Sequence, residues 1–129
     1  MYRTPTILIV DDEEPTLLAM MDYFTHYGFA VDGSRDFSTA KALLMANPYT
    51  ALITDLQLAE PGDKSGFDLI SFARNTRPDT RLILLTAHES SEVEAEARRL
   101  GTDAFLPKPQ PLSKLGQIVC DLLPAAGCP

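Results

Sequence analysis

Four segments of the chain end in polar side chains that together could bind a phosphoryl group. Asp11 and Asp12 follow the apolar run TILIV, Asp55 ends TALITD, Thr86 follows RLILL, and Lys108 follows DAFLP. Two carboxylates about 4 Å apart repel each other by roughly 1 kcal/mol in water and about 4 kcal/mol near a protein surface. A divalent cation removes this repulsion. Because no Cys or His cluster accompanies these acids, the residue types favour Mg²⁺.

This set of residues suits the transfer of a phosphoryl group to a carboxylate. Asp55 could attack phosphorus, as carboxylates do in aspartyl-phosphate enzymes. The metal ion, Lys108 and the Thr86 hydroxyl could hold the phosphoryl oxygens, because this reaction depends mostly on positioning and charge neutralisation. Taken singly, each residue has an ordinary explanation as a helix start, a turn, a strand residue or a solvated charge. Only their joint placement at strand ends predicts a site.

The elements that must position these residues alternate between apolar runs and helical patterns. The runs begin near residues 7, 29, 51, 82 and 104. Parallel strands need crossover connections, which helices supply. We therefore expect an α/β fold, a (βα)5 doubly wound parallel five-stranded sheet with helices on both faces. With the strand order 2-1-3-4-5, the first and third strands are neighbours, so the three acids share one pocket at the carboxyl ends of the strands.

Two helical patterns give specific packing expectations. The first helix has an apolar face that ends before Gly28 and comprises Leu17, Met20 or Met21, Phe24 and Tyr27. The segment ESSEVEAEARRLG has a much thinner apolar face, made of Val93, Ala97 and Leu100. We expect this fourth helix to be weakly held.

Composition sets the class of protein. A chain of 129 residues with 45% hydrophobic residues is the size of one domain. We place a single domain at residues 1–123 and a C-terminal tail at 124–129. No apolar stretch approaches the length of a membrane span or a secretion signal, so we expect a cytoplasmic location and no membrane contact. The formal net charge of -7 argues against direct nucleic-acid binding. Cys120 and Cys128 lack metal-ligand spacing.

The motifs ILIVDDE, LITD, LLTA and FLPKP, which occur in this order over nearly the whole chain, resemble those of two-component response regulator receiver domains. The resemblance implies that Asp55 accepts a phosphoryl group from a phosphohistidine, on a sensor histidine kinase or a phosphotransfer protein. It implies that Asp12, Asp55 and the backbone carbonyl of Gln57 ligate Mg²⁺, while Asp11 acts mostly through water.

The resemblance also implies how a signal is read out. Lys108 would pair with the phosphoryl group, and the hydroxyl of Thr86 would bond to it. Phe105 fits the switch aromatic of the family, and the bond from Lys108 to Pro109 fits its cis peptide. The fourth helix, fifth strand and fifth helix would form the face that changes, which could meet a second copy or a downstream effector. His88 on the pocket rim either tunes water access or is an ordinary exposed turn residue.

One loop departs from the family pattern. Family members commonly have Met-Pro three and four residues after the acceptor and Gly eight after it, where this chain has Leu58, Ala59 and Asp63. The loop 56–66 is therefore expected to be about three residues longer than usual. Because long surface insertions cost little free energy, we expect it to bulge outward without displacing Asp55.

Other functions fit the residues less well. A flavin or nucleotide carrier needs a Gly/Ser/Thr-rich loop after the first strand, where this chain has DDEEP. A low-molecular-weight phosphatase needs a Cys and an Arg in that loop. A metal-dependent phosphatase with an aspartate nucleophile is the main alternative, but it places its acids in one DxD stretch and adds a cap. We expect a phosphoacceptor switch that assists its own phosphorylation and dephosphorylation, not a turnover enzyme.

Overall fold

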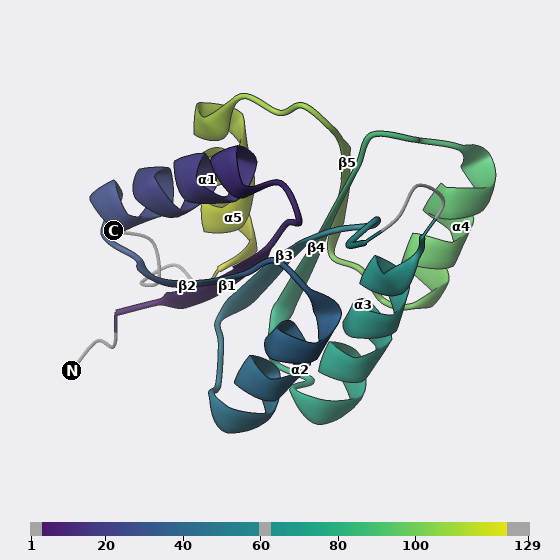
Figure 1. The fold of residues 1–129 in the computed structure, drawn as a ribbon, viewed down its shortest axis with the longest axis horizontal. Coiled ribbons are helices and arrows are strands. Elements are labelled where there is room, and N and C mark those ends of the chain that lie inside the picture. Colours follow the sequence, from purple (N-terminus) through teal and green to yellow (C-terminus); the bar gives the residue numbers. More distant parts are fainter. Residues whose placement is uncertain (1–3, 60–62, 124–129) are drawn as a thin grey trace.

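The computed structural model describes residues 4–59 and 63–123 (Figure 1). Residues 60–62 of the predicted longer loop and the predicted tail 124–129 lie outside this part of the chain. Strands and helices alternate from β1 to α5: β1 (Thr6–Val10), α1 (Glu14–His26), β2 (Ala30–Ser34), α2 (Phe37–Ala46), β3 (Ala51–Asp55), α3 (Ser65–Thr76), β4 (Arg81–Thr86), α4 (Ser91–Arg99), β5 (Ala104–Pro107) and α5 (Leu112–Leu122).

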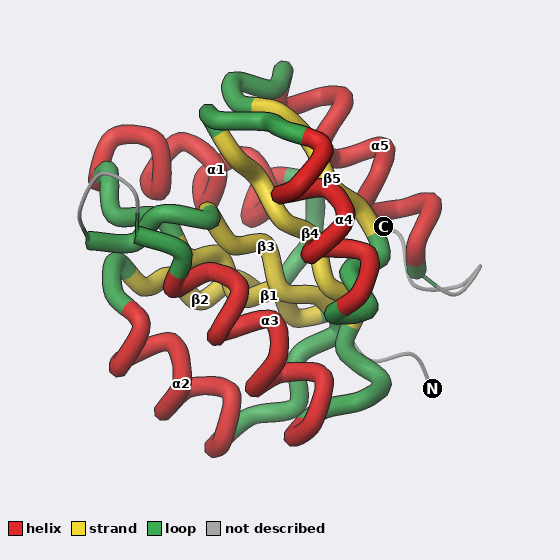
Figure 2. Tube along the Cα trace, turned by 90° about the vertical axis from the view of Figure 1, so that its right-hand side faces the viewer, coloured by secondary structure: helices red, strands yellow, loops and turns green. Residues whose placement is uncertain are grey.

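The strands form one parallel sheet in the order β2-β1-β3-β4-β5, which confirms the predicted fold class. Helices α1 and α5 cover one face, and α2, α3 and α4 cover the other (Figures 1 and 2). The central strands are continuous apolar runs because both of their faces are covered. Successive residues point to opposite faces, so Leu8 and Leu52 pack under α2 and α3 while Ile7 and Ile53 pack under α1 and α5.

The end of α1 differs in one respect from the predicted apolar face. Gly28, with a φ of 105°, follows the helix as expected. Tyr27, however, is 42% exposed and stacks on Tyr23, with ring centroids 5.8 Å apart. The core position beside Phe24 belongs instead to Phe29, whose ring lies 5.6 Å away. Tyr27 keeps helical backbone geometry and bonds to the Tyr23 carbonyl at 3.0 Å, so its exposure follows from the ring of Phe29 filling the core beside Phe24.

Helix α4 has the thin apolar face that its sequence predicts. Val93 and Ala97 are buried and Leu100 is half-buried. Its outer face carries two ion pairs within the helix, one from Arg98 to Glu94 at 3.0 Å and one from Arg99 to Glu96 at 2.7 Å. Exposed pairs of this kind contribute little free energy. The helix is therefore attached to the sheet mainly by two small side chains.

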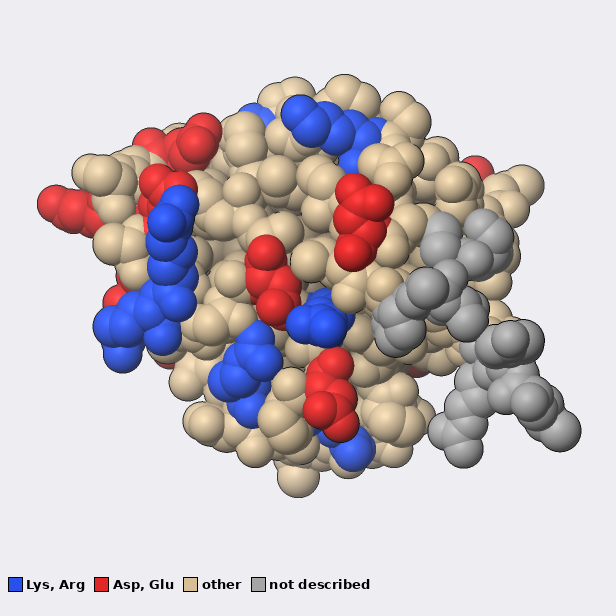
Figure 3. All heavy atoms as spheres, turned by 180° about the vertical axis from the view of Figure 1, so that it is seen from behind, with Lys and Arg blue, Asp and Glu red and all other residues tan. Residues whose placement is uncertain are grey.

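Two properties of the described residues bear on membrane and nucleic-acid contact: the length and hydrophobicity of the helices and the arrangement of charged side chains. No helix within residues 4–59 and 63–123 combines the length and the hydrophobicity that crossing a membrane requires. On the face shown in Figure 3, acidic and basic side chains alternate and do not gather into one basic patch.

Candidate functional site

Three acids meet at the carboxyl ends of β1 and β3, because these strands are neighbours in the sheet. Asp11, Asp12 and Asp55 each offer one carboxylate oxygen, and these oxygens all lie within 4.8 Å of one another. Asp11 is fully buried, Asp55 is 8% exposed, and Asp12 is half-buried. Three oxygen donors that converge in this way are a donor set that fits Mg²⁺.

Lys108, after β5, supplies the positive charge at these acids. Its Nζ donates hydrogen bonds to Asp11 Oδ2 at 2.8 Å and to Asp55 Oδ2 at 3.1 Å. Burial alone would lower the pKa of Lys108, but its bonds to Asp11 and the charge of Asp55 outweigh this effect and raise the pKa. The ammonium group therefore keeps its charge inside the pocket. The peptide bond from Lys108 to Pro109 is cis.

The other predicted residues lie around the acids. Asp12, Asp55, Gln57 and Lys108 line a cavity of about 680 Å³ that continues between α1 and α5. Thr86 is buried at the end of β4, and its carbonyl accepts a hydrogen bond from the backbone N–H of Lys108 at 2.8 Å. The structure thus brings the residues predicted from strand ends to one edge of the sheet.

The predicted switch and rim residues lie on the α4 side of this edge. Phe105 is half-buried on β5 and packs against the core cluster that contains Val93 and Ala97 of α4. His88 is exposed, and its backbone N–H donates to Thr86 Oγ1 at 3.0 Å. It lines a second, smaller cavity of about 430 Å³ between the loops that follow β3 and β4.

The family model of the response regulator receiver domain matches residues 7–120. The chain belongs to this family. As a receiver domain, it is the signalling-switch part of a two-component system.

Named relatives agree with this assignment. The receiver domain is 30% identical over 104 residues to the photosynthetic apparatus regulatory protein RegA of Cereibacter sphaeroides, with 81% of this chain and 55% of that protein covered. It is 31% identical over 118 residues to the response regulator protein PilR of Pseudomonas aeruginosa, and this match covers 90% of this chain and 25% of PilR. The chain thus spans about half of the length of RegA and a quarter of PilR.

Solved structures show the same fold. A response regulator from Burkholderia pseudomallei, solved with a phosphorylated aspartic acid, a calcium ion and citrate, is 26% identical with a TM-score of 0.80, and the match covers 86% of this chain and 64% of that one. A CheY-like receiver domain from Methanospirillum hungatei is 23% identical with a TM-score of 0.87, and the match covers 92% and 93%.

Two elements hold Asp55 in place in this receiver domain. Lys108 holds its carboxylate, and the start of α3 packs directly on its backbone. The N–H of Gly66 donates to the carbonyl of Leu56 at 2.8 Å, and a Cβ at position 66 would lie 2.3 Å from the carbonyl oxygen of Asp55. Asp55 faces Asp12, as expected. The outward bulge expected of the loop 56–66 stays a prediction, because residues 60–62 at its centre lie outside the described part of the chain.

Arg35 is a residue of the site that the sequence did not indicate. Its guanidinium donates to the backbone carbonyl of Asp12, a partner 23 positions away in the chain. A single exposed arginine after a strand forms no sequence motif. Because its acceptor is a backbone carbonyl, the type of the residue that it binds gives no signal in the sequence either. Only the pairing of β1 with β2 brings the two residues together.

Burial raises the pKa of Asp55 above its ordinary value. The charge and the hydrogen bond of Lys108 act in the opposite direction, while the charges of Asp11 and Asp12 add to the rise. In the folded state this carboxyl therefore binds its proton more tightly than in the unfolded state. The free energy of unfolding then decreases as the pH rises from the unfolded-state pKa to the folded-state pKa, because the folded state holds more protons over that window.

We expect carbon-detected NMR titration in EDTA to find the Asp55 carboxyl titrating above the ordinary range of aspartate. Lys108→Met should raise this pKa further, since the lysine lowers it. Asp55→Asn serves to assign the titrating signal. An Asp55 carboxyl that titrates at or below the ordinary value, or that does not respond to Lys108→Met, would contradict this picture of the pocket.

Proposed function

We propose that Asp55 accepts a phosphoryl group from a phosphohistidine of a sensor histidine kinase or phosphotransfer protein, in a Mg²⁺-dependent reaction. The observation that supports this most is the convergence of three carboxylates with Lys108, which donates to two of them. A carboxylate oxygen of Asp55 forms the bond to phosphorus as the phosphorus–nitrogen bond breaks. The electron pair of that bond stays on the imidazole of the donor.

Each residue of the pocket has a part in this proposal. Asp12, Asp55 and the backbone carbonyl of Gln57 would hold Mg²⁺, with Asp11 acting through water. When bound, the ion neutralises charge on the acids and on the phosphoryl oxygens. Lys108 is already bonded to Asp55 Oδ2 and would pair with a phosphoryl oxygen on that side. The response regulator from Burkholderia pseudomallei was solved with a phosphorylated aspartic acid and a calcium ion. By analogy, it supports phosphorylation of an aspartate next to a divalent cation.

The switch would begin at Thr86. Its hydroxyl accepts a hydrogen bond from the backbone N–H of His88. On phosphorylation the hydroxyl would turn to donate a hydrogen bond to a phosphoryl oxygen. Phe105 would then move toward the space that the Thr86 side chain leaves. Because α4 is thinly packed, it is the part of the face formed by α4, β5 and α5 that would move at the least cost in free energy. A change of population from about 1:99 to 99:1 needs roughly 5.5 kcal/mol of differential stabilisation. A second copy of the chain or a downstream effector would read this face.

Incubation with acetyl phosphate tests the proposal. With Mg²⁺ present the protein should gain one phosphoryl group per chain, and with EDTA it should gain none. The labelling should stop at one equivalent. Continued release of phosphate from a phosphomonoester such as p-nitrophenyl phosphate would instead favour the alternative function, a metal-dependent aspartate phosphatase with turnover.

His88 provides a separate prediction about how long the phosphoryl group persists. Its exposed imidazole lies at the small cavity through which water would approach from the α4 side. We expect His88→Ala to speed dephosphorylation by about fivefold, the equivalent of about 1 kcal/mol from a less shielded phosphoryl group. The decay of the phosphorylated protein, followed by intact mass, measures this rate. Equal rates in His88→Ala and wild type would leave His88 as an ordinary exposed turn residue.

A further inference from the structure

The side chain of Arg35 is bonded to the loop that carries Asp12. Its Nε and Nη2 donate to the Asp12 carbonyl oxygen at 3.2 Å and 3.0 Å, and its Nη1 lies 3.4 Å from Glu14 Oε2. Two donors of one planar guanidinium thus converge on a single acceptor. Arg35 is exposed, so these contacts do not arise from tight packing of its side chain.

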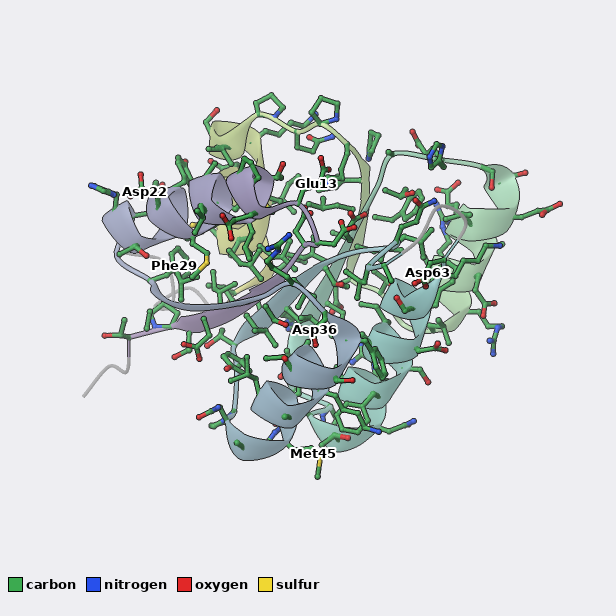
Figure 4. All side chains as sticks on the ribbon, viewed as in Figure 1. Glu13, Asp22, Phe29, Asp36, Met45 and Asp63 are labelled. Carbon is green, nitrogen blue, oxygen red and sulfur yellow. The ribbon has the colours of Figure 1, made fainter. Side chains whose placement is uncertain are left out.

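The backbone that carries Arg35 is fixed on both sides. Before it, the carbonyl of Ser34 accepts the N–H of Asp11 at 3.0 Å, which joins the ends of β2 and β1. After it, Asp36 caps α2 by accepting the N–H of Thr39 at 2.7 Å, and Figure 4 shows Asp36 at the start of that helix. The guanidinium therefore extends from a segment that has little freedom to move.

The peptide group that Arg35 binds is also held from its other end. The Asp12 carbonyl and the Glu13 N–H belong to one planar unit. The carbonyl accepts from Arg35, while the Glu13 N–H donates to Asp11 Oδ1 at 2.9 Å. No side-chain cap at Glu13 holds the start of α1. The two bonds together restrain the rotation of this peptide plane and so hold the Cα of Asp12, from which its side chain extends toward the site.

Asp12 depends on this restraint more than the other two acids do. The carboxylates of Asp11 and Asp55 are both bonded to Lys108. The carboxylate of Asp12 makes no hydrogen bond within the described residues, so its position is set through its backbone. Within the site, Asp12 is the acid whose direction the neighbouring side chains leave open.

We infer that Arg35 is a positioning residue for Asp12 as a Mg²⁺ ligand, an inference that rests on the metal site in the proposed function. The restraint and the charge of Arg35 have opposite effects. The restraint strengthens Mg²⁺ binding by orienting Asp12, whereas a positive charge near the site weakens the binding of a cation. Lysine keeps the charge but cannot present two donors in a fixed planar fork. Substitution by lysine therefore removes the restraint alone.

The experiment measures Mg²⁺ affinity directly by isothermal titration calorimetry, without phosphorylation. We expect Arg35→Lys to weaken binding by about three- to tenfold, the range that one or two lost hydrogen bonds would produce. Arg35→Ala should weaken it less, since the lost charge partly compensates. Arg99→Ala is the matched control, because it removes one exposed, carboxylate-paired arginine on α4. This control should leave the affinity within about twofold of wild type.

A second readout separates positioning from a loss of fold. In metal-free protein, the amide signal of Glu13 should shift in both Arg35 variants, while their unfolding midpoints stay close to wild type. The inference is overturned if Arg35→Lys binds Mg²⁺ as wild type does, or if Arg35→Ala binds it more tightly than wild type. If the wild-type protein binds no Mg²⁺, the proposed metal site itself is overturned. If wild type and the Arg35 variants bind Mg²⁺ equally, the metal site stands and only the role of Arg35 is overturned.

Discussion

Asp55→Asn is expected to abolish phosphorylation of this receiver domain and to leave the domain folded. The amide has nearly the shape of the carboxylate but no anionic oxygen to attack phosphorus. Folding should not suffer, because the substitution removes a buried charge whose pKa burial already raises. Lys108 retains its bond to Asp11 at 2.8 Å, so no buried cation is left alone. We expect the stability to be unchanged or higher by about 1 kcal/mol.

The measurement is the intact mass after incubation with acetyl phosphate and Mg²⁺. Wild type should gain the mass of one phosphoryl group, and Asp55→Asn should gain none. Asp22→Asn is the control, because this carboxyl is 75% exposed on α1 and the same chemical change there leaves the site untouched. Labelling of Asp55→Asn at the wild-type level would show that Asp55 is not the residue that accepts the phosphoryl group.

Gly66→Ala should have the largest effect on stability among the glycine substitutions. A Cβ at this position would lie 2.3 Å from the carbonyl oxygen of Asp55 and 2.7 Å from the Cα of Leu56. Both are backbone atoms of the strand end that carries Asp55, so α3 or the strand must move. Overpacking of this kind costs roughly 1–3 kcal/mol, and we expect about 3 kcal/mol because neither neighbour can turn away. The displaced Asp55 should also be phosphorylated more slowly.

Urea unfolding measures this loss, and the chain provides a matched control. A Cβ at Gly33 would meet Met21 Sδ at the same distance of 2.3 Å, but that atom ends a flexible side chain. Gly33→Ala should therefore cost less than about 1 kcal/mol, since methionine adapts to changes in space. Equal midpoints for the two variants would show that the close approach of α3 to Asp55 does not constrain the strand end.

The sequence predicts those features that depend on residue type at strand ends. The acids after β1 and at the end of β3, and the lysine after β5, were predictable because parallel strands place these positions at one edge of the sheet. The thin face of α4 could likewise be read from Val93 and Ala97. Their spacing shows which side chains the helix can bury.

Features that depend on the approach of distant segments could not be predicted. The bond from Arg35 to Asp12 joins a side chain to a backbone carbonyl, so no complementary residue marks it. The exposure of Tyr27 depends on Phe29, a residue beyond the helix, taking the core position beside Phe24. The part played by Gly66 depends on how closely α3 approaches β3. In each case the local pattern fits several arrangements, and tertiary packing selects one.

Strand β5 contributes to two separate cores, one on each face of the sheet. Ala104 and Leu106 pack with α1 and α5, while Phe105 packs with the cluster that includes α4. A rearrangement of Phe105 would therefore act first on the core that contains α4. Helix α5 lies on the opposite face of the sheet, so a change at α5 has to pass through β5 itself, by way of Ala104 and Leu106 in the second core.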